Sequence, residues 1–133
     1  MIESDQDPFR DAPVIFRYTR HQAIEDGVLV DLTEWAAETG IKFPVACTAA
    51  VWNGHVVPPD KTRQFGQSER GRAHDLLWML FNKIRMSAGG DRLFFEVIFL
   101  TSAKQHVTAT FKALCGPGDS GEPVITIMMP DED

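Results

Sequence analysis

The chain has 133 residues, of which 44% are hydrophobic and 24% charged, and its formal net charge at pH 7 is -6. This length predicts one domain that buries roughly two thirds of its unfolded surface around a single core. No apolar run approaches the ~20 residues of a membrane span, and the acidic balance disfavours contact with nucleic-acid phosphates. We therefore expect neither a membrane nor direct binding of nucleic acid.

The start of the chain and its cysteines indicate a cytoplasmic protein. The opening residues, MIESDQDPFRD, are acidic and polar, whereas a signal peptide would be basic and then apolar. Cys47 and Cys115 are far apart and form no CxxC pair, which suits a reducing compartment. We expect no disulfide between them.

The first part of the chain predicts an arm and then the start of a single domain. Residues 1–12 are polar and lack an apolar period, so we expect a flexible acidic arm before an α+β domain at 13–133. The run from Pro13 to Tyr18 is rich in strand-forming residues. Thr19 then caps a helix that extends to Asp26, because the next residue is a glycine suited to a left-handed helix end.

A second strand and a second helix follow in the same order. Residues 28–32 (VLVDL) predict a strand, and EWAAET predicts a short helix that Gly40 ends. In the next segment Pro44 excludes a regular helix, while Thr48 can cap one or two helical turns. The N-terminal half is therefore expected to be a strand-helix-strand-helix unit with an irregular extension.

The longest predicted helix extends from Arg72 to Ala88, after a polar loop at 60–71. One face carries apolar residues at helical spacing, namely Ala73, Leu76, Leu77, Leu80, Phe81 and Ile84. The other side carries His74, Trp78, Met79 and Met86. These are more apolar side chains than a helix face in contact with water normally carries. We expect the N-terminal segments or a partner to cover that side.

Three alternating runs after this helix predict an antiparallel meander. They are RLFFEVIFLT, HVTATFKAL and PVITIMM, and each places apolar side chains on one face and polar ones on the other. On the polar face we expect Glu96 to pair with Lys112 across neighbouring strands. The fold class is therefore α+β, with the long helix packed on a three-stranded antiparallel meander.

The stretch GDSGEP, from Gly118 to Pro123, differs by one letter from the loop that holds the nucleophilic serine of trypsin-like proteases. Such an enzyme needs two β-barrels and a histidine and an aspartate from the other barrel, whereas the chain before this stretch is largely helical. The glycines lie between two alternating runs, which is typical of a hairpin connection. We interpret Ser120 as a turn residue and expect no catalytic residue here.

Metal and nucleotide motifs give equally little support for an enzyme. The four histidines, His21, His55, His74 and His106, show neither HxxxH nor HExxH spacing. GxGxxG and GKS or GKT phosphate-binding motifs are absent as well. We expect no metal and no cofactor, and we interpret His74 as a packing partner of Trp78 one turn later.

Four stretches carry a resemblance that covers nearly the whole chain. They are FRYTRHQAIEDGVLVDLTEWA, FPVACTAAVW, LLWM and CGPGDSGEPVITIMMPDED. Together they resemble a family of small bacterial proteins encoded on plasmids and integrative elements, a domain of unknown function. The resemblance implies an accessory gene of mobile DNA, of the kind that serves transfer, maintenance or evasion of host defences.

Six residues are candidates for a binding site. Tyr18, Thr19 and Arg20 stand where a strand meets a helix, and a helix start can bind an anion. Trp52 is either a core aromatic or a stacking platform. The others, Asp75 and Trp78, lie on the long helix, where the helix dipole alone explains Asp75.

Three classes of function remain open. The first is a non-enzymatic accessory or anti-defence factor, whose acidic surface or Trp- and Met-rich helix binds another protein. We also expect that the chain can form a homodimer. The second is a small enzyme with an ADP-ribosyltransferase-like NAD site, in which Glu122 or Glu96 would be the acid. The third, a nucleic-acid-associated regulator, is disfavoured by the negative charge.

Overall fold

The computed structural model describes residues 18–102 and 104–133. The arm expected at 1–12 and the strand expected from Pro13 to Tyr18 fall outside the described residues, apart from Tyr18 itself. The elements are, in order, α2 (Arg20–Glu25), β2 (Leu29–Asp31), α3 (Thr33–Thr39), β3 (Val45–Thr48), α4 (Ala49–Val51), the π-helical turn η1 (Trp52–Val56), α5 (Asp60–Arg63), α6 (Glu69–Met86), β4 (Arg92–Leu100), β5 (His106–Pro117) and β6 (Pro123–Met128).

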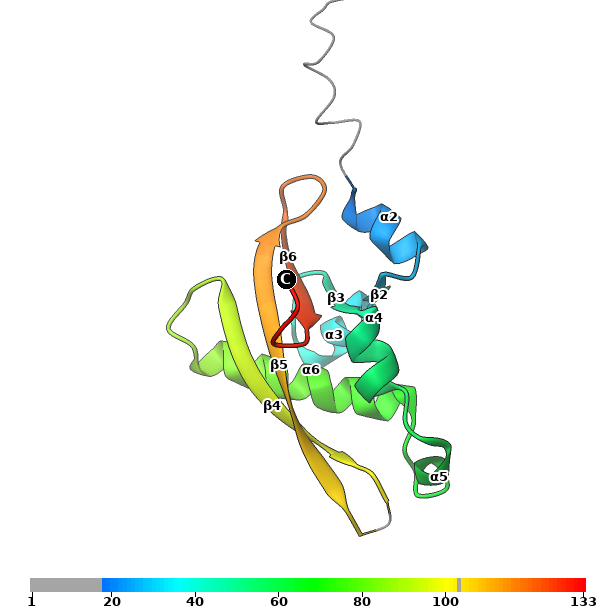
Figure 1. Ribbon diagram of the computed structural model, residues 1–133. Helices are drawn as coiled ribbons and strands as arrows, with labels where there is room; N and C mark the ends of the chain where they lie inside the picture. Colours follow the sequence, from blue (N-terminus) through cyan, green and yellow to red (C-terminus); the bar gives the residue numbers. More distant parts are fainter. Residues whose placement is uncertain (1–17, 103) are drawn as a thin grey trace, which may run out of the picture.

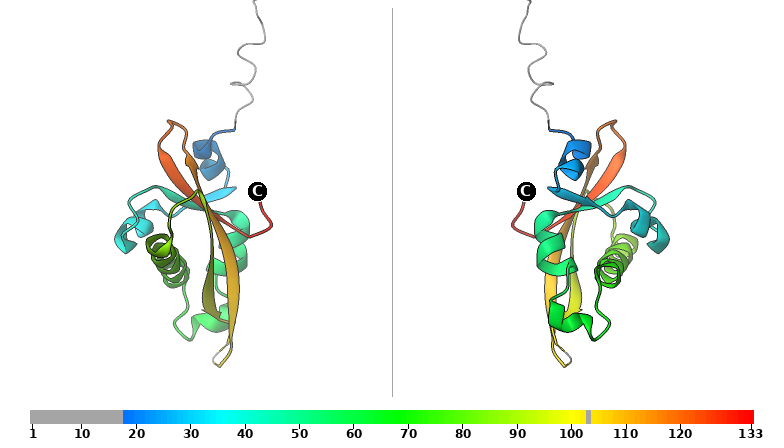
Figure 2. Two further views of the ribbon diagram at one scale, coloured as in Figure 1. Left: turned by 90° about the vertical axis from the view of Figure 1, so that its left-hand side faces the viewer. Right: turned by 90° about the vertical axis from the view of Figure 1, so that its right-hand side faces the viewer.

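The strands form one five-stranded sheet in the order β2-β3-β6-β5-β4. Strands β4, β5 and β6 are an antiparallel meander, as predicted. Helices α3 and α6 lie on one face of the sheet, and the C-terminus lies on the other (Figures 1 and 2). The α+β prediction with a long central helix is thus confirmed, but the sheet has two strands more than the predicted meander.

The extra strand β3 is the main correction to the predicted elements. Its four residues lie between β2, which is antiparallel to it, and β6, which is parallel. Val45, Ala46 and Cys47 are fully buried, so the strand shows no alternation of apolar and polar residues. Pro44 precedes the strand and does not interrupt it, and its carbonyl accepts a hydrogen bond from Ile125 N at 2.9 Å.

The predicted signals at the ends of the short helices are confirmed. Thr19 caps α2, since its side chain accepts from Gln22 N and the Gln22 side chain accepts from Thr19 N. Gly40 ends α3 with a φ of 116°, in the left-handed region. Thr48 caps α4 by accepting from Val51 N at 3.3 Å.

The long helix begins three residues earlier than predicted. Ser68 is its N-cap and accepts from Gly71 N at 3.0 Å, so Glu69 is already helical. Part of the predicted loop at 60–71 is the short helix α5. The predicted apolar face is otherwise buried against the sheet at Ala73, Leu76, Leu77 and Leu80, whereas Phe81 is partly buried and Ile84 is 36% exposed.

Candidate functional site

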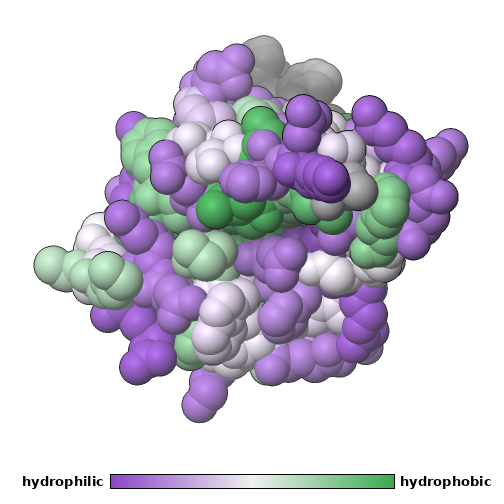
Figure 3. All heavy atoms as spheres, turned by 90° about the horizontal axis from the view of Figure 1, so that it is seen from below, coloured by the Kyte–Doolittle hydropathy of each residue, from purple (hydrophilic) through white to green (hydrophobic). Residues whose placement is uncertain are grey.

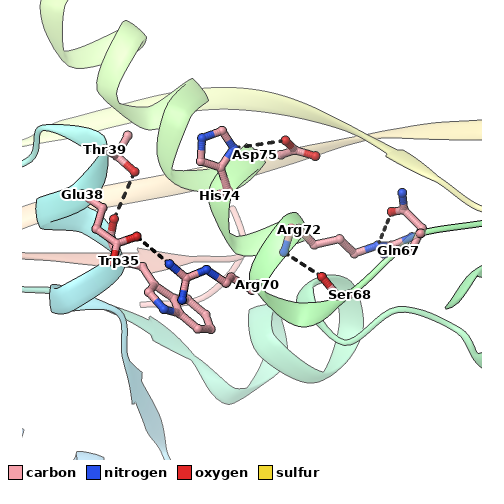
Figure 4. Close-up of a pocket in the computed structure, with 11 residues that line it drawn as sticks. Trp35, Glu38, Thr39, Gln67, Ser68, Arg70, Arg72, His74 and Asp75 are labelled. Atoms are coloured by element: carbon pink, nitrogen blue, oxygen red, sulfur yellow. Dashed lines mark hydrogen bonds and ion pairs between the residues drawn. The ribbon is translucent and has the colours of Figure 1, made fainter.

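A cleft with a volume of about 620 Å³ lies between α3 and the first turns of α6. Its walls include Trp35 and Glu38 from α3 and Arg70, His74 and Asp75 from α6. Figure 4 shows these side chains around the cleft, with Arg70 reaching from α6 toward Trp35 and Glu38. Of the six predicted site residues, only Asp75 lines this cleft.

Arg70 connects the two helices across the cleft. Its Nη2 donates to Glu38 Oε1 at 2.8 Å, and its Cζ lies 5.5 Å from the centre of the Trp35 ring. Both charged side chains are more than half exposed, at 64% and 58%. An exposed ion pair adds little stability, so this contact chiefly holds a cation and an aromatic ring in place at the surface.

His74 and Trp78 form a second aromatic group on the same helix. Their ring planes are 6° from parallel with centroids 6.5 Å apart, which confirms the predicted packing. Trp78 also packs on Phe81, and it remains 45% exposed. Asp75 Oδ1 lies 3.7 Å from His74 Nδ1. Trp78 therefore presents an exposed aromatic surface beside the cleft.

Arg72 lies at the base of the cleft and is only 4% exposed. Its guanidinium donates to Gln67 Oε1 at 3.1 Å, to the His55 carbonyl at 2.8 Å and to the Leu100 carbonyl. Burial lowers the pKa of Arg72 from its usual value. Arg72 was predicted only as a helix start, so its burial is a correction. No local pattern signals it, because the His55 and Leu100 carbonyls that it binds lie 17 and 28 residues away in the sequence.

Tyr18, Thr19 and Arg20 do lie together, lining a separate hollow of about 350 Å³. Arg20 Nη1 donates to Thr126 Oγ1 at 2.7 Å, and its Nη2 donates to the Ile125 carbonyl at 2.8 Å. Burial lowers the pKa of Arg20. In this structure Arg20 thus fastens α2 to β6, and anion binding at this helix start stays a prediction.

Tyr18 contacts the other end of the same short helix. Its hydroxyl donates to Asp26 Oδ2 at 2.7 Å, and this hydrogen bond raises the pKa of Tyr18. The ring is 54% exposed. The hydroxyl groups of Tyr18 and Thr19 are therefore both hydrogen-bonded to residues of the N-terminal unit.

The GDSGEP stretch connects β5 to β6, which confirms the turn interpretation. Asp119 accepts from Arg20 N at 2.8 Å and from His21 N at 3.0 Å, so it caps α2 from a distant part of the chain. Glu122 folds back into the turn, where its Oε1 accepts from Ser120 N at 2.9 Å. Sequence reasoning missed the contact of Asp119, since nothing near this turn identifies a partner about a hundred residues earlier.

Two further predictions concern Trp52 and Glu96. Trp52 is partly buried against the core and lines a smaller hollow together with Trp35, away from Trp78. The predicted Glu96–Lys112 pair is wrong, because the register places Thr110 opposite Glu96 and Phe94 opposite Lys112. Lys112 is instead 7% exposed and donates to the Glu132 carbonyl.

Within residues 18–102 and 104–133, no three His, Cys, Asp or Glu side chains are grouped so as to hold a metal ion. None of the helices in this part of the chain is both long and apolar enough to cross a membrane.

Comparison with known proteins identifies a family to which the chain belongs. The model of DUF6573, described as a family of unknown function, matches residues 6–133. No curated protein and no solved structure matches the chain. The match covers nearly the whole chain, as the resemblance seen in the sequence does.

Proposed function

The chain belongs to DUF6573, a family of unknown function, and we propose that it is a non-enzymatic, protein-binding accessory factor of a mobile genetic element. The resemblance to proteins encoded on plasmids and integrative elements supports the genetic context. The observation that carries the binding role is the aromatic and cationic rim of the cleft between α3 and α6: Trp35, Arg70 and His74 line the cleft, and Trp78 extends the rim because its ring stacks on His74.

This rim has the composition of a protein-binding centre. Trp and Arg are the residues most enriched among those that dominate binding energy at interfaces. Trp78 is 45% exposed and its ring is already oriented by His74, so little conformational freedom is lost when a partner covers it. Arg70 is likewise held over Trp35 before any partner arrives.

The overall charge of the chain indicates the chemistry of the partner. The charges in the cleft itself are balanced, because Glu38 and Asp75 line it together with Arg70 and Arg72, whereas the whole chain carries a net charge of -6. Such a field speeds association with a positively charged surface. We therefore expect the partner to be a host protein with a positively charged surface that places an apolar side chain into the cleft.

Affinity capture followed by calorimetry tests this function. The tagged protein captures its partner from a lysate of the host bacterium, and the dissociation constant of the purified pair is then measured. Trp78→Ala and Arg70→Ala should each weaken binding by about tenfold or more, as expected for dominant interface residues. Phe43→Ala is the matched control, because Phe43 is 47% exposed but lies outside the cleft.

The same calorimeter separates the proposal from its alternative. Raising the salt concentration should weaken the complex, because surface charges are screened. Unchanged binding by both cleft variants would contradict the proposal. Specific binding of NAD would favour the enzyme class, in which Glu122 or Glu96 supplies the acid.

A further inference from the structure

Strand β4 forms one edge of the sheet. It contains nine residues, and the strand order places β5 on one side and no strand of the described chain on the other. Figure 1 shows β4 as the outermost strand of the meander, with α6 passing behind it. A long edge with unpaired backbone groups is a template for pairing with another strand.

The hydrogen bonds to β5 identify which backbone groups are available. Cys115 N donates to the Asp91 carbonyl and Thr101 N to the Gln105 carbonyl, both at 2.8 Å. These two pairs belong to one continuous register, so the odd-numbered residues of β4 bond to β5. The even-numbered residues, Arg92 to Leu100, therefore direct their N–H and C=O groups toward the free edge.

The side chains of four of these even-numbered residues, Arg92, Phe94, Glu96 and Ile98, are exposed on the face away from α6. Phe94 is 48% and Ile98 60% exposed, although both are large and apolar. Arg92 and Glu96 lie beside them and are exposed as well. The edge thus combines free backbone groups, apolar side chains and one charge of each sign.

Helix α6 adds apolar surface next to this edge. Arg72 donates to the carbonyl of Leu100, one of the groups on the free edge, so this flank of α6 faces the edge. Met79 and Met86 follow Arg72 at intervals of seven residues and lie on the same flank. They are 41% and 81% exposed. The view from below in Figure 3 shows hydrophobic residues at the surface between hydrophilic ones.

We propose that a second copy of the chain pairs with the first half of this edge, residues 92–96 of one β4 against residues 92–96 of the other in antiparallel orientation, about a two-fold axis through Phe94. The two sheets then form one ten-stranded sheet, since each copy contributes five strands. A two-fold, self-complementary contact is the commonest arrangement in small homo-oligomers. Met79 and Met86 of both copies lie beneath the joined strands and lose contact with water.

The charges select this axis among the possible ones. The hydrogen-bonding pattern requires even-numbered residues to face even-numbered residues. An axis through Glu96 would bring two carboxylates together. An axis through Phe95 pairs both charges with apolar residues, and an axis through Val97 pairs Glu96 with Ile98 and moves Arg92 beyond the end of the partner strand. The axis through Phe94 alone places Arg92 of each copy opposite Glu96 of the other, on both sides of a Phe94–Phe94 contact.

A charge exchange tests the proposal. Sedimentation equilibrium in the micromolar range should show a dimer. Glu96→Arg or Arg92→Glu alone places like charges opposite each other twice, and should raise the dimer dissociation constant on the order of tenfold or more. The double variant with both substitutions restores opposite charges and should restore the dimer. Glu25→Arg, with the same change of charge on exposed α2, should leave the dimer unchanged.

Thermal melting shows whether the variants remain folded, which is expected because both positions are exposed. Amide hydrogen exchange gives a second readout, since the amides of Phe94 and Glu96 point to the free edge and have no backbone partner among the described residues of one copy, so they should be protected only in the dimer. A monomer at all concentrations overturns the proposal. A dimer whose dissociation constant is unchanged by the charge substitutions also overturns it. So does a dimer in which the Phe94 and Glu96 amides are not protected from hydrogen exchange.

This surface is separate from the cleft of the proposed function. Trp78→Ala should leave the dimer intact, and the β4 variants should leave binding in the cleft intact. Edge amides that become protected only when a foreign protein is added would assign the edge to that protein and overturn the second copy as its occupant. Failure of either proposal is therefore distinguishable from failure of the other.

Discussion

The guanidinium carbon of Arg72 lies 5.0 Å from the centre of the Phe99 ring, which joins the central helix α6 to strand β4. The same guanidinium donates to three acceptors, among them the carbonyl groups of His55 and Leu100. A buried arginine that serves three acceptors in different elements has no close substitute, because the planar group fixes all three directions.

Replacing Arg72 should therefore destabilise the fold strongly. Arg72→Met keeps the length of the side chain but leaves three acceptors unpaired, and the free energy of unfolding should fall by about 3 kcal/mol. Denaturant unfolding measures it. Arg70→Met is the matched control in the same first turn of α6, and it should cost less than about 1 kcal/mol because Arg70 is exposed. Equal losses in the two variants would contradict the buried role of Arg72.

Glycine replacements at the ends of the two short helices should differ in cost. A Cβ at Gly40 would lie 3.2 Å from the Phe81 ring, and φ there is 116°, so Gly40→Ala should cost about 2 kcal/mol or more. Gly27 has a φ of 78° with open space around it, and Gly27→Ala should cost only about 1 kcal/mol. Thermal melts of both variants compare them directly, and a costlier Gly27→Ala would refute this packing of Phe81.

Local sequence signals predicted helices α2 and α3 correctly, but they missed the short helix α5 and the strand β3 between the sheet halves. Thr19 and Gly40 act within four residues of themselves, so their roles can be inferred from neighbouring letters. Strand β3 has only four residues and is buried on both faces, so it shows no period that distinguishes it from a loop. Its position depends on β2 and β6, which lie far away in the sequence.

The candidate site was predicted less well than the fold, for a related reason. The cleft depends on the contact between Arg70 and Trp35, which lie on different helices and are 35 positions apart in the sequence. The stacking of His74 on Trp78 was predictable because both lie on one helix, one turn apart. Contacts across elements require the tertiary fold, which neither composition nor period specifies.

The turn between β5 and β6 should tolerate loss of its serine but not of its aspartate. Asp119→Ala removes the acceptor for Arg20 N and His21 N, and should lower stability by about 1 kcal/mol. Ser120→Ala should change it by less than ~0.5 kcal/mol. Chemical denaturation compares the two. Labelling of Ser120 by a fluorophosphonate would overturn its interpretation as a turn residue.

Phe111 should be among the most costly core positions. It is 0% exposed, and its ring packs against Phe95 with centroids 5.7 Å apart and against Phe99 at 6.1 Å. Phe111→Ala should lower the free energy of unfolding by ~3 to 5 kcal/mol. Phe65→Ala provides the comparison, since Phe65 is 47% exposed, and a loss below ~1 kcal/mol at Phe111 would contradict its central position.

His55 should make the stability of the protein depend on pH in the weakly acidic range. Its ring lies 5.2 Å from Phe111 and 6.0 Å from Phe99, centroid to centroid. Burial, followed by the nearby charge of Arg72, lowers the pKa of His55 below its ordinary value of 6.5. The folded state therefore favours the neutral ring, whereas the unfolded chain takes up a proton near pH 6.5. Its contribution is present above that pH and is lost as the pH falls through the lowered pKa.

Denaturant unfolding at a series of pH values from neutral to weakly acidic should reveal this loss in the wild-type protein. His55→Gln cannot take up a proton, so the difference in unfolding free energy between wild type and variant should shift in favour of the variant as the pH falls. His21→Gln is the control, because His21 is exposed on α2. The His21→Gln control keeps His55, so its unfolding free energy should show the same loss at weakly acidic pH as that of the wild type. A constant difference between wild type and His55→Gln across the whole range would show that the His55 ring titrates alike in the folded and unfolded chains, contrary to its packing against two buried phenylalanines.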